Sequence, residues 1–254
     1  MIKSGLVSIS FRQLSTEKII NMVKKAGLEG IEWGGDVHVP HGDLEKASEV
    51  FKKTEEAGLE VAAYGSYYRV GTDNPEIGSF DEILKTAVKL KAPLIRVWAG
   101  DRGSKEADED WRKEVIRESR EIASRASEKD IKIAYEYHDG TLTDTKKSAI
   151  KLLNEVDHDN IYCYWQPPHG MDVNSRLISL KEIGEYLTNI HVFYWESHQR
   201  YPLIKAKKDW IKYLREVSNL PGTHYAMLEF VKNDDPEQFF EDAKVLKEIV
   251  AEVN

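Results

Sequence analysis

Four polar residues stand within or directly after short apolar runs in the second half of the chain. They are two carboxylates, Glu136 and Glu229, one amide, Gln166, and one imidazole, His191. Each of them alone could be a buried polar side chain that pairs with a neighbour. Together, carboxylate and amide oxygens and an imidazole nitrogen are donors suited to Mn²⁺, Mg²⁺, Co²⁺ or Zn²⁺. The sequence therefore predicts a divalent-metal site, provided that the fold brings the four runs to one place.

The apolar runs alternate with longer amphipathic stretches, which is typical of βα units that build a parallel sheet. We expect strands at residues 3–9, 30–34, 59–65, 93–99, 131–137, 160–166, 189–195 and 224–230. We expect helices at residues 15–27, 44–58, 78–92, 108–130, 143–156, 175–187, 206–219 and 236–252. No linker or Gly-rich phosphate loop interrupts the series. It therefore favours a single (β/α)₈ TIM barrel over residues 1–254, because an open doubly wound sheet normally has about five or six strands.

The alternation of side chains along a strand predicts which residues enter the barrel. Residues two apart point to the same side, so on the expected strand 131–137 Tyr135 faces the helices and Glu136 faces the interior. The same rule points the other three candidate ligands inwards, near the carboxyl ends of the strands, where active sites of such barrels lie. Carboxylates buried there without a partner would cost several kcal/mol, so a shared cation is the favoured interpretation.

Other inward-facing residues have two interpretations each. Glu32 and Arg96 lie on the second and fourth expected strands, where an internal ion pair is the favoured account and substrate contact is the alternative. Trp98 lies near the end of the fourth expected strand and could form an aromatic wall for a small polyol, although core packing explains it equally well.

Polar residues on the loops after the strands are further candidates for substrate contact. His138 and His169 follow the fifth and sixth strands and could orient other groups, bind substrate or act as acid and base. Arg200, after the seventh strand, could hold a substrate oxygen. Four other histidines are interpreted as loop or surface residues: His38, His41, His158 and His224.

Composition limits the classes of partner. The formal net charge of -8 argues against broad binding of nucleic acid or an anionic membrane surface. The start has no apolar signal segment, and no apolar run is long enough to span a membrane, so we expect a soluble cytoplasmic protein. The single cysteine, Cys163, is interpreted as a buried thiol. A small sugar or polyol is the expected partner, and a homo-oligomer is compatible with the sequence.

At these residues the chain resembles the xylose-isomerase-like TIM-barrel superfamily, also described as sugar phosphate isomerases/epimerases or AP endonuclease 2-like proteins. The resemblance covers essentially the whole chain. It rests on residues 30–34 (GIEWG), 97–100 (VWAG), 135–138 (YEYH), 166–169 (QPPH) and 228–230 (LEF), and on His191. Residues 136–138 followed by 141–145 (TLTDT), together with 9–12 (ISFR), are most similar to bacterial 3-dehydroshikimate dehydratases.

The resemblance implies a ligand set. In the superfamily a Glu, an Asp, a His and a Glu on strands five to eight hold the metal, which corresponds here to Glu136, Gln166, His191 and Glu229. His169 matches a histidine close to the substrate. Gln166 departs from the pattern, and the loss of one negative charge implies weaker metal affinity. The additional histidines of endonuclease IV have no counterparts here, which argues against a DNA-repair nuclease.

Three functions remain open. The first is a metal-dependent sugar isomerase or epimerase that acts through an enediolate, with Glu136 and Glu229 moving the proton from opposite sides. The second is a 3-dehydroshikimate dehydratase-like lyase, in which His138 assists loss of water. Such a lyase needs a cation for the substrate carboxylate, and the candidates are Arg12, Arg69, Arg96, Arg102 and Arg200. The third is a non-catalytic sugar-binding barrel with a weakened metal site.

Overall fold

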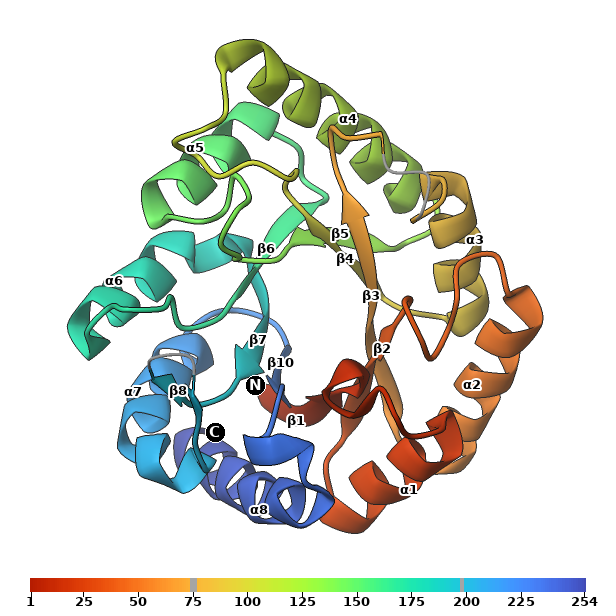
Figure 1. The fold of residues 1–254 in the computed structure, drawn as a ribbon, viewed down its shortest axis with the longest axis vertical. Coiled ribbons are helices and arrows are strands. Elements are labelled where there is room, and N and C mark those ends of the chain that lie inside the picture. Colours follow the sequence, from red (N-terminus) through yellow and green to blue (C-terminus); the bar gives the residue numbers. More distant parts are fainter. Residues whose placement is uncertain (74–76, 197–198) are drawn as a thin grey trace.

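Eight parallel strands close into a barrel inside a ring of helices (Figure 1). The computed structural model describes residues 1–73, 77–196 and 199–254. The barrel strands are β1 (Ile2–Val7), β2 (Gly30–Gly34), β3 (Glu60–Arg69), β4 (Leu94–Trp98), β5 (Lys132–Tyr135), β6 (Ile161–Trp165), β7 (Leu187–Val192) and β10 (His224–Leu228). Their order around the barrel is β1-β10-β7-β6-β5-β4-β3-β2. The predicted (β/α)₈ TIM barrel is confirmed.

Each barrel strand is followed by an α-helix. The helices are α1 (Thr16–Ala26), α2 (Leu44–Glu56), α3 (Phe80–Leu90), α4 (Glu109–Ser127), α5 (Lys146–Val156), α6 (Val173–Ile183), α7 (Lys207–Ser218) and α8 (Pro236–Val253). Local capping explains their ends. The Ser15 side chain accepts a hydrogen bond from the Lys18 backbone at the start of α1, and Gly27 ends α1 in the left-handed conformation. No helix in the described ranges is both long and apolar enough to cross a membrane.

Two strands depart from the expected boundaries at the end where the candidate site lies. β3 runs to Arg69 instead of ending at residue 65, and its pairing with β4 shifts between Gly65 and Arg69. β7 starts at Leu187, which was expected to be helical, and ends at Val192. The chain then leaves the barrel and forms a small antiparallel hairpin of β8 (Trp195–Glu196) and β9 (Gln199–Arg200). Local patterning ended β3 too early because Gly65 and Ser66 interrupt its apolar run. It ended β7 too late because apolar residues continue from Phe193 to Trp195.

The core has two layers, as the parity argument predicts. Inside the barrel lie mostly small or medium side chains: Val7, Ile9, Ala62, Ala63, Leu94, Ala134, Tyr164, Tyr225 and Met227. A larger layer lies between strands and helices, where Trp165 contacts Trp210 and Tyr213 of α7. Cys163 is buried, as expected. His38 lies on the loop after β2, as predicted, although it is buried and hydrogen-bonded. His224 is buried on β10 and hydrogen-bonded, so the prediction that it is a loop or surface residue is wrong.

A buried carboxylate fixes the chain where it returns from the hairpin to α7. Asp242 on α8 accepts hydrogen bonds from the Leu203 backbone (2.8 Å) and from the Gln238 side chain (2.9 Å), both at Oδ1. Burial raises the pKa of Asp242 from its ordinary 3.8 to about 6. Its stabilising contribution is therefore fully present below the ordinary pKa and is lost as the pH rises through about 6.

We expect Asp242→Asn to be more stable than the wild type at pH 7.5, by about 1–3 kcal/mol. The amide keeps an oxygen acceptor for Leu203 and Gln238 but carries no charge that burial would penalise. Urea unfolding at pH 4.5 and pH 7.5 checks this, with the exposed Asp159→Asn as the control. Equal stability differences at the two pH values would contradict the assignment.

Candidate metal centre

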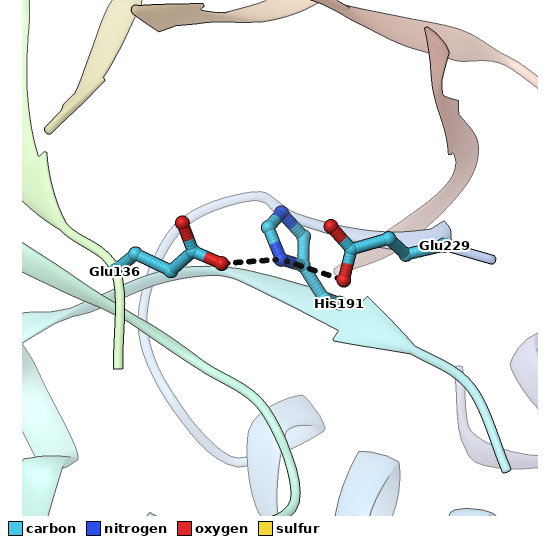
Figure 2. Close-up of side chains that lie close together, drawn as sticks. All are labelled: Glu136, His191 and Glu229. Carbon is cyan, nitrogen blue, oxygen red and sulfur yellow. Dashed lines mark ion pairs between the residues drawn. The ribbon is translucent and has the colours of Figure 1, made fainter. Parts of the chain in front are cut away.

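Glu136, His191 and Glu229 converge inside the barrel, close to the carboxyl ends of the strands. Glu136 follows β5, His191 lies on β7 and Glu229 follows β10, and all three are buried. One potential ligand atom from each lies within 4.8 Å of those of the other two. The two carboxylates approach the His191 imidazole from opposite sides (Figure 2). His191 Nδ1 is 3.7 Å from Glu136 Oε1 and 3.4 Å from Glu229 Oε2.

Gln166 directs its amide oxygen at the same nitrogen. Gln166 Oε1 lies 3.2 Å from His191 Nδ1, while its Nε2 donates to the Tyr137 carbonyl oxygen at 2.8 Å. The second hydrogen bond determines which end of the amide faces the centre, because a carbonyl can only accept. The structure thus brings together donor atoms from all four residues predicted as ligands.

The chemistry of this donor set fits a divalent cation. Three oxygens surround one imidazole nitrogen, and two of them belong to carboxylates that are 4% and 6% exposed. Carboxylates buried so close together require a positive charge between or beside them. The buried Glu136, His191 and Glu229 could therefore hold a metal ion, with Gln166 as a neutral fourth donor.

A buried arginine, Arg96, connects the Glu136 carboxylate of the centre to a further buried carboxylate, Glu32. Arg96 on β4 donates through Nε to Glu32 Oε1 (2.6 Å) and through Nη1 to Glu136 Oε2. The predicted ion pair of Glu32 and Arg96 is confirmed. The other Glu32 oxygen lies 3.5 Å from His191 Nε2, and Glu32 is fully buried. These contacts favour a role in orienting His191 and Arg96 over the alternative of substrate contact by Glu32.

These contacts shift the pKa values of the cluster in different directions. Burial disfavours the charged form of Glu136, but attraction to Arg96 and then His191 outweighs burial and lowers the pKa of Glu136. Burial raises the pKa of Glu229, and repulsion from Glu136 adds to this effect. Burial disfavours the imidazolium form, but Glu229, Glu136 and Glu32 together raise the pKa of His191 to about 10. The cluster thus favours an added positive charge, which in a metal complex would come from the ion.

Trp98 and His138 form one side of the barrel mouth. Trp98 Nε1 donates to Glu136 Oε2 at 2.5 Å, so the indole also fixes that carboxylate. The His138 ring stacks on the indole, with centroids 4.8 Å apart and an angle of 27° between the rings. His138 and His169 line a cavity of about 100 Å³ next to Gln166. Both histidines are therefore placed where a ligand beside the centre would lie.

The opposite side of the mouth carries the hairpin. The Trp195 ring stacks on His169 (centroids 5.5 Å apart) and lies 5.7 Å from the ring of Phe230, which directly follows Glu229. Arg200 lies over both Trp195 and Phe230 and pairs with Asp234 at 2.5 Å. This carboxylate already occupies the guanidinium, so substrate contact by Arg200 stays a prediction.

Sequence reasoning ended the third strand at residue 65, so it placed Tyr67 and Arg69 beyond the strand and gave Arg69 only as one of five candidate cations for a substrate carboxylate. The shifted register sets Arg69 opposite Trp98, and Tyr67 adopts a left-handed conformation (φ 57°). Bulges of this kind re-aim side chains and are frequent beside active sites. The two tyrosines and the arginine that follow Gly65 and Ser66 are the signal that could have extended the strand.

The profile of one protein family matches residues 20–249 and is described as "Xylose isomerase-like TIM barrel". The chain belongs to this family. A curated relative, 3-dehydroshikimate dehydratase of Bacillus anthracis, is 28% identical over 166 residues, which are 63% of this chain and 59% of the relative. The match thus spans about three-fifths of that relative's length.

Solved structures share the fold over nearly the whole chain. The probable 3-DHS dehydratase AsbF from Bacillus anthracis superposes with a TM-score of 0.82 at 23% identity, covering 97% of this chain and 99% of that one. D-psicose 3-epimerase from Clostridium cellulolyticum H10 gives 0.73 at 16% identity, with 98% of both chains covered. The IOLI protein, solved with a zinc atom, gives 0.75 at 16% identity, with 99% of both chains covered. Relatives on this fold thus include a dehydratase, an epimerase and a zinc-binding protein.

We expect Gln166→Asp to bind Mn²⁺ or Zn²⁺ roughly tenfold more tightly, because it adds a carboxylate to the donor set. Titration of metal-free protein by calorimetry measures the change. Gln166→Ala is the control and should bind more weakly than the wild type. Equal affinity in all three proteins would show that residue 166 is not a ligand.

We expect Arg96→Met to be destabilised by about 3–5 kcal/mol, because it leaves Glu32 and Glu136 as uncompensated buried charges. Denaturant unfolding at neutral pH measures this loss. The exposed Arg117→Met, which removes two helix-surface ion pairs, should change stability far less than Arg96→Met. A similarly small change in Arg96→Met would contradict the role given to Arg96.

Proposed function

We propose that this chain is a divalent-metal-dependent isomerase or epimerase that moves a proton at a carbon next to a carbonyl of a sugar-like substrate. The observation that carries the proposal is the placement of Glu136 and Glu229 on opposite sides of His191 (Figure 2). Inversion at a carbon requires one group to remove the proton and another to return it from the other face. Two carboxylates that directly follow separate strands meet this requirement.

The two carboxylates are held differently, which suits different roles. Glu136 Oε2 accepts from Arg96 and Trp98, so Glu136 Oε1 is left to face the centre. No hydrogen-bond donor contacts the Glu229 carboxylate within the described ranges, apart from the nearby imidazole of His191. Glu136 is thus the rigid member of the pair, and Glu229 has more freedom to follow a proton. A divalent ion bound beside them would polarise the substrate carbonyl and stabilise the negative charge that develops next to it.

The comparisons support this class of chemistry at a coarse level. D-psicose 3-epimerase and a zinc-containing protein share the fold, and dehydratases share it as well. The first step of such a dehydratase is the same as in an isomerase, because a base removes a proton next to a ketone. The proton transfer is therefore common to both reactions, and they differ only in what happens to the intermediate afterwards.

A second candidate is the dehydratase reaction on a 3-dehydroshikimate-like substrate. Its support is the curated relative at 28% identity and the position of His138, which stacks on Trp98 beside the Glu136 carboxylate. After proton removal, His138 could protonate the departing hydroxyl group so that water leaves. In an isomerase the same hydroxyl stays, and His138 only contacts it.

The proposal predicts that Glu136→Gln and Glu229→Gln each lose at least about 10³-fold in proton exchange, because each removes an acid–base group. Metal-free protein is reloaded with Mn²⁺, Mg²⁺, Co²⁺ or Zn²⁺ and mixed in D₂O with ketoses, aldoses, inosose-like polyols and 3-dehydroshikimate. Deuterium incorporation and the products are followed by NMR. The control is Glu60→Gln, which changes a strand carboxylate at the opposite end of the barrel.

The outcomes separate the three functions. An epimer or isomer supports the leading proposal, and an aromatic product from 3-dehydroshikimate supports the dehydratase. Ligand binding without any exchange in the wild type points to a non-catalytic sugar-binding barrel. Full exchange in both Glu variants would refute the assignment of Glu136 and Glu229.

A separate substitution tests the dehydratase. We expect His138→Asn to slow loss of water by about 10²–10⁴-fold and to leave deuterium exchange nearly unchanged, because the histidine acts after proton removal. His158→Asn, far from the mouth on the loop before β6, is the control. A parallel loss of exchange and dehydration in His138→Asn would mean that this histidine serves the first step.

A further inference from the structure

The extended part of β3 delivers a guanidinium to the barrel mouth. Gly65 pairs with Arg96, and Arg69 pairs with Trp98, so the bulge between them moves Arg69 level with the indole. The Arg69 guanidinium carbon lies 4.1 Å from the centroid of the Trp98 ring. Because Trp98 Nε1 donates to Glu136, one indole separates Arg69 from the candidate metal centre.

The other four arginines considered for anion binding already have carboxylate partners. They pair as follows: Arg12 with Asp36, Arg96 with Glu32 and Glu136, Arg102 with Asp101 and Asp108, and Arg200 with Asp234. An arginine saturated by a carboxylate would have to give up that bond to bind an anionic ligand. Arg12, Arg96 and Arg200 are therefore poor receptors for a second anion. Arg102 is held less closely, 4.0 Å from Asp101 and 3.8 Å from Asp108, but it lies over the Trp111 ring and not over Trp98.

Arg69 differs from them in this respect. Within the described part of the chain, no carboxylate forms a salt bridge with Arg69, and its guanidinium donates no hydrogen bond to the protein. Its side chain is only partly exposed, and burial lowers the pKa of Arg69, with Asp101 as the one acid that opposes this shift. When a half-buried guanidinium lies over an indole, its N–H groups point outwards in the plane of the guanidinium. They are therefore free to bind an incoming anion.

We propose that Arg69 binds an anionic group of the substrate, a carboxylate or a phosphate, and thereby restricts this site to charged substrates. The inference rests on the proposed function for one point, namely that the reacting end of the substrate lies at the metal centre. The anionic group and the reacting carbon then lie on either side of Trp98, at different ends of the substrate. Trp98 forms the surface between them, and Arg69 is a specificity-determining residue.

Ligands that differ at one substituent test this directly. Binding of glucose, glucuronate and glucose 6-phosphate, and of shikimate and its methyl ester, is measured by calorimetry on zinc-loaded protein. We expect the wild type to prefer an anionic ligand over its neutral counterpart. If glucuronate binds more tightly than glucose 6-phosphate, the anionic group is a carboxylate. The reverse order identifies a phosphate.

Arg69→Met should lower the affinity for the preferred anionic ligand roughly 10- to 100-fold. The affinities for its neutral counterpart and for zinc should stay unchanged. Arg69→Lys should restore part of the preference. The matched control is Arg102→Met, since Arg102 also lies over an indole, that of Trp111, but is paired with aspartates. We expect no loss of anion binding in this control.

The results distinguish this inference from the proposed function. No anion preference in the wild type, including no binding of any ligand, overturns the role of Arg69, as does an equal loss of neutral and anionic ligands in Arg69→Met. If the preference depends on Arg69 but no substrate exchanges a proton, the inference stands and the proposed enzyme activity fails. If neutral sugars turn over and Arg69→Met is unaffected, the enzyme activity stands and the inference fails.

Discussion

The interior of this barrel depends on one buried guanidinium. Arg96 is 1% exposed and bridges Glu32 and Glu136, two carboxylates that could not be buried together without it. Through Glu32 it also acts on His191, whose second nitrogen faces that carboxylate. Arg96 therefore holds both Glu136, a candidate ligand and acid–base group, and Glu32, which contacts the His191 imidazole.

The close packing around Arg96 leaves little room for substitution. Gly65 on the neighbouring strand has no side chain, and a Cβ there would lie 2.7 Å from Arg96 Nη2 and 2.8 Å from Glu32 Oε1. Only glycine leaves space for the ion pair at this level of the barrel. The bulge in β3 begins directly after this residue, so the strand first makes room for Arg96 and then turns Arg69 towards the mouth.

Above this charged layer, the mouth has two aromatic sides, and their side chains come from different kinds of secondary structure. Trp98 and Tyr67 lie on strands, and the His138 ring stacks on Trp98 from the start of the loop after β5. All three are connected to the centre through the hydrogen bond from Trp98 to Glu136. Trp195 belongs to a hairpin outside the barrel and contacts His169 on a loop. The metal centre thus rests on rigid strands, whereas part of the surrounding surface rests on loops, which in barrel enzymes commonly set the substrate.

The amino-acid sequence by itself determined the barrel and the inward direction of its polar residues. Alternation along the strands placed Ala134, Tyr164 and Met227 inside, and the structure confirms this because burial on one face imposes a period of two. Parity and position together also indicated His191 and the three residues around its Nδ1, which are Glu136, Gln166 and Glu229. Alternation and position along a strand are local properties, so they can be read from the sequence of each strand separately.

Only the tertiary structure decided which charges meet and which remain free. Five arginines looked equivalent in the sequence, yet Arg12, Arg96 and Arg200 pair with acids from other segments. Arg102 lies near two aspartates of its own loop, and Arg69 lies over the Trp98 ring. The hairpin after β7 and the bulge in β3 were also missed, because local patterning does not show where a strand loses its partner or shifts its register. Pairing energies depend on distances between segments far apart in the chain, and those distances exist only once the barrel has closed.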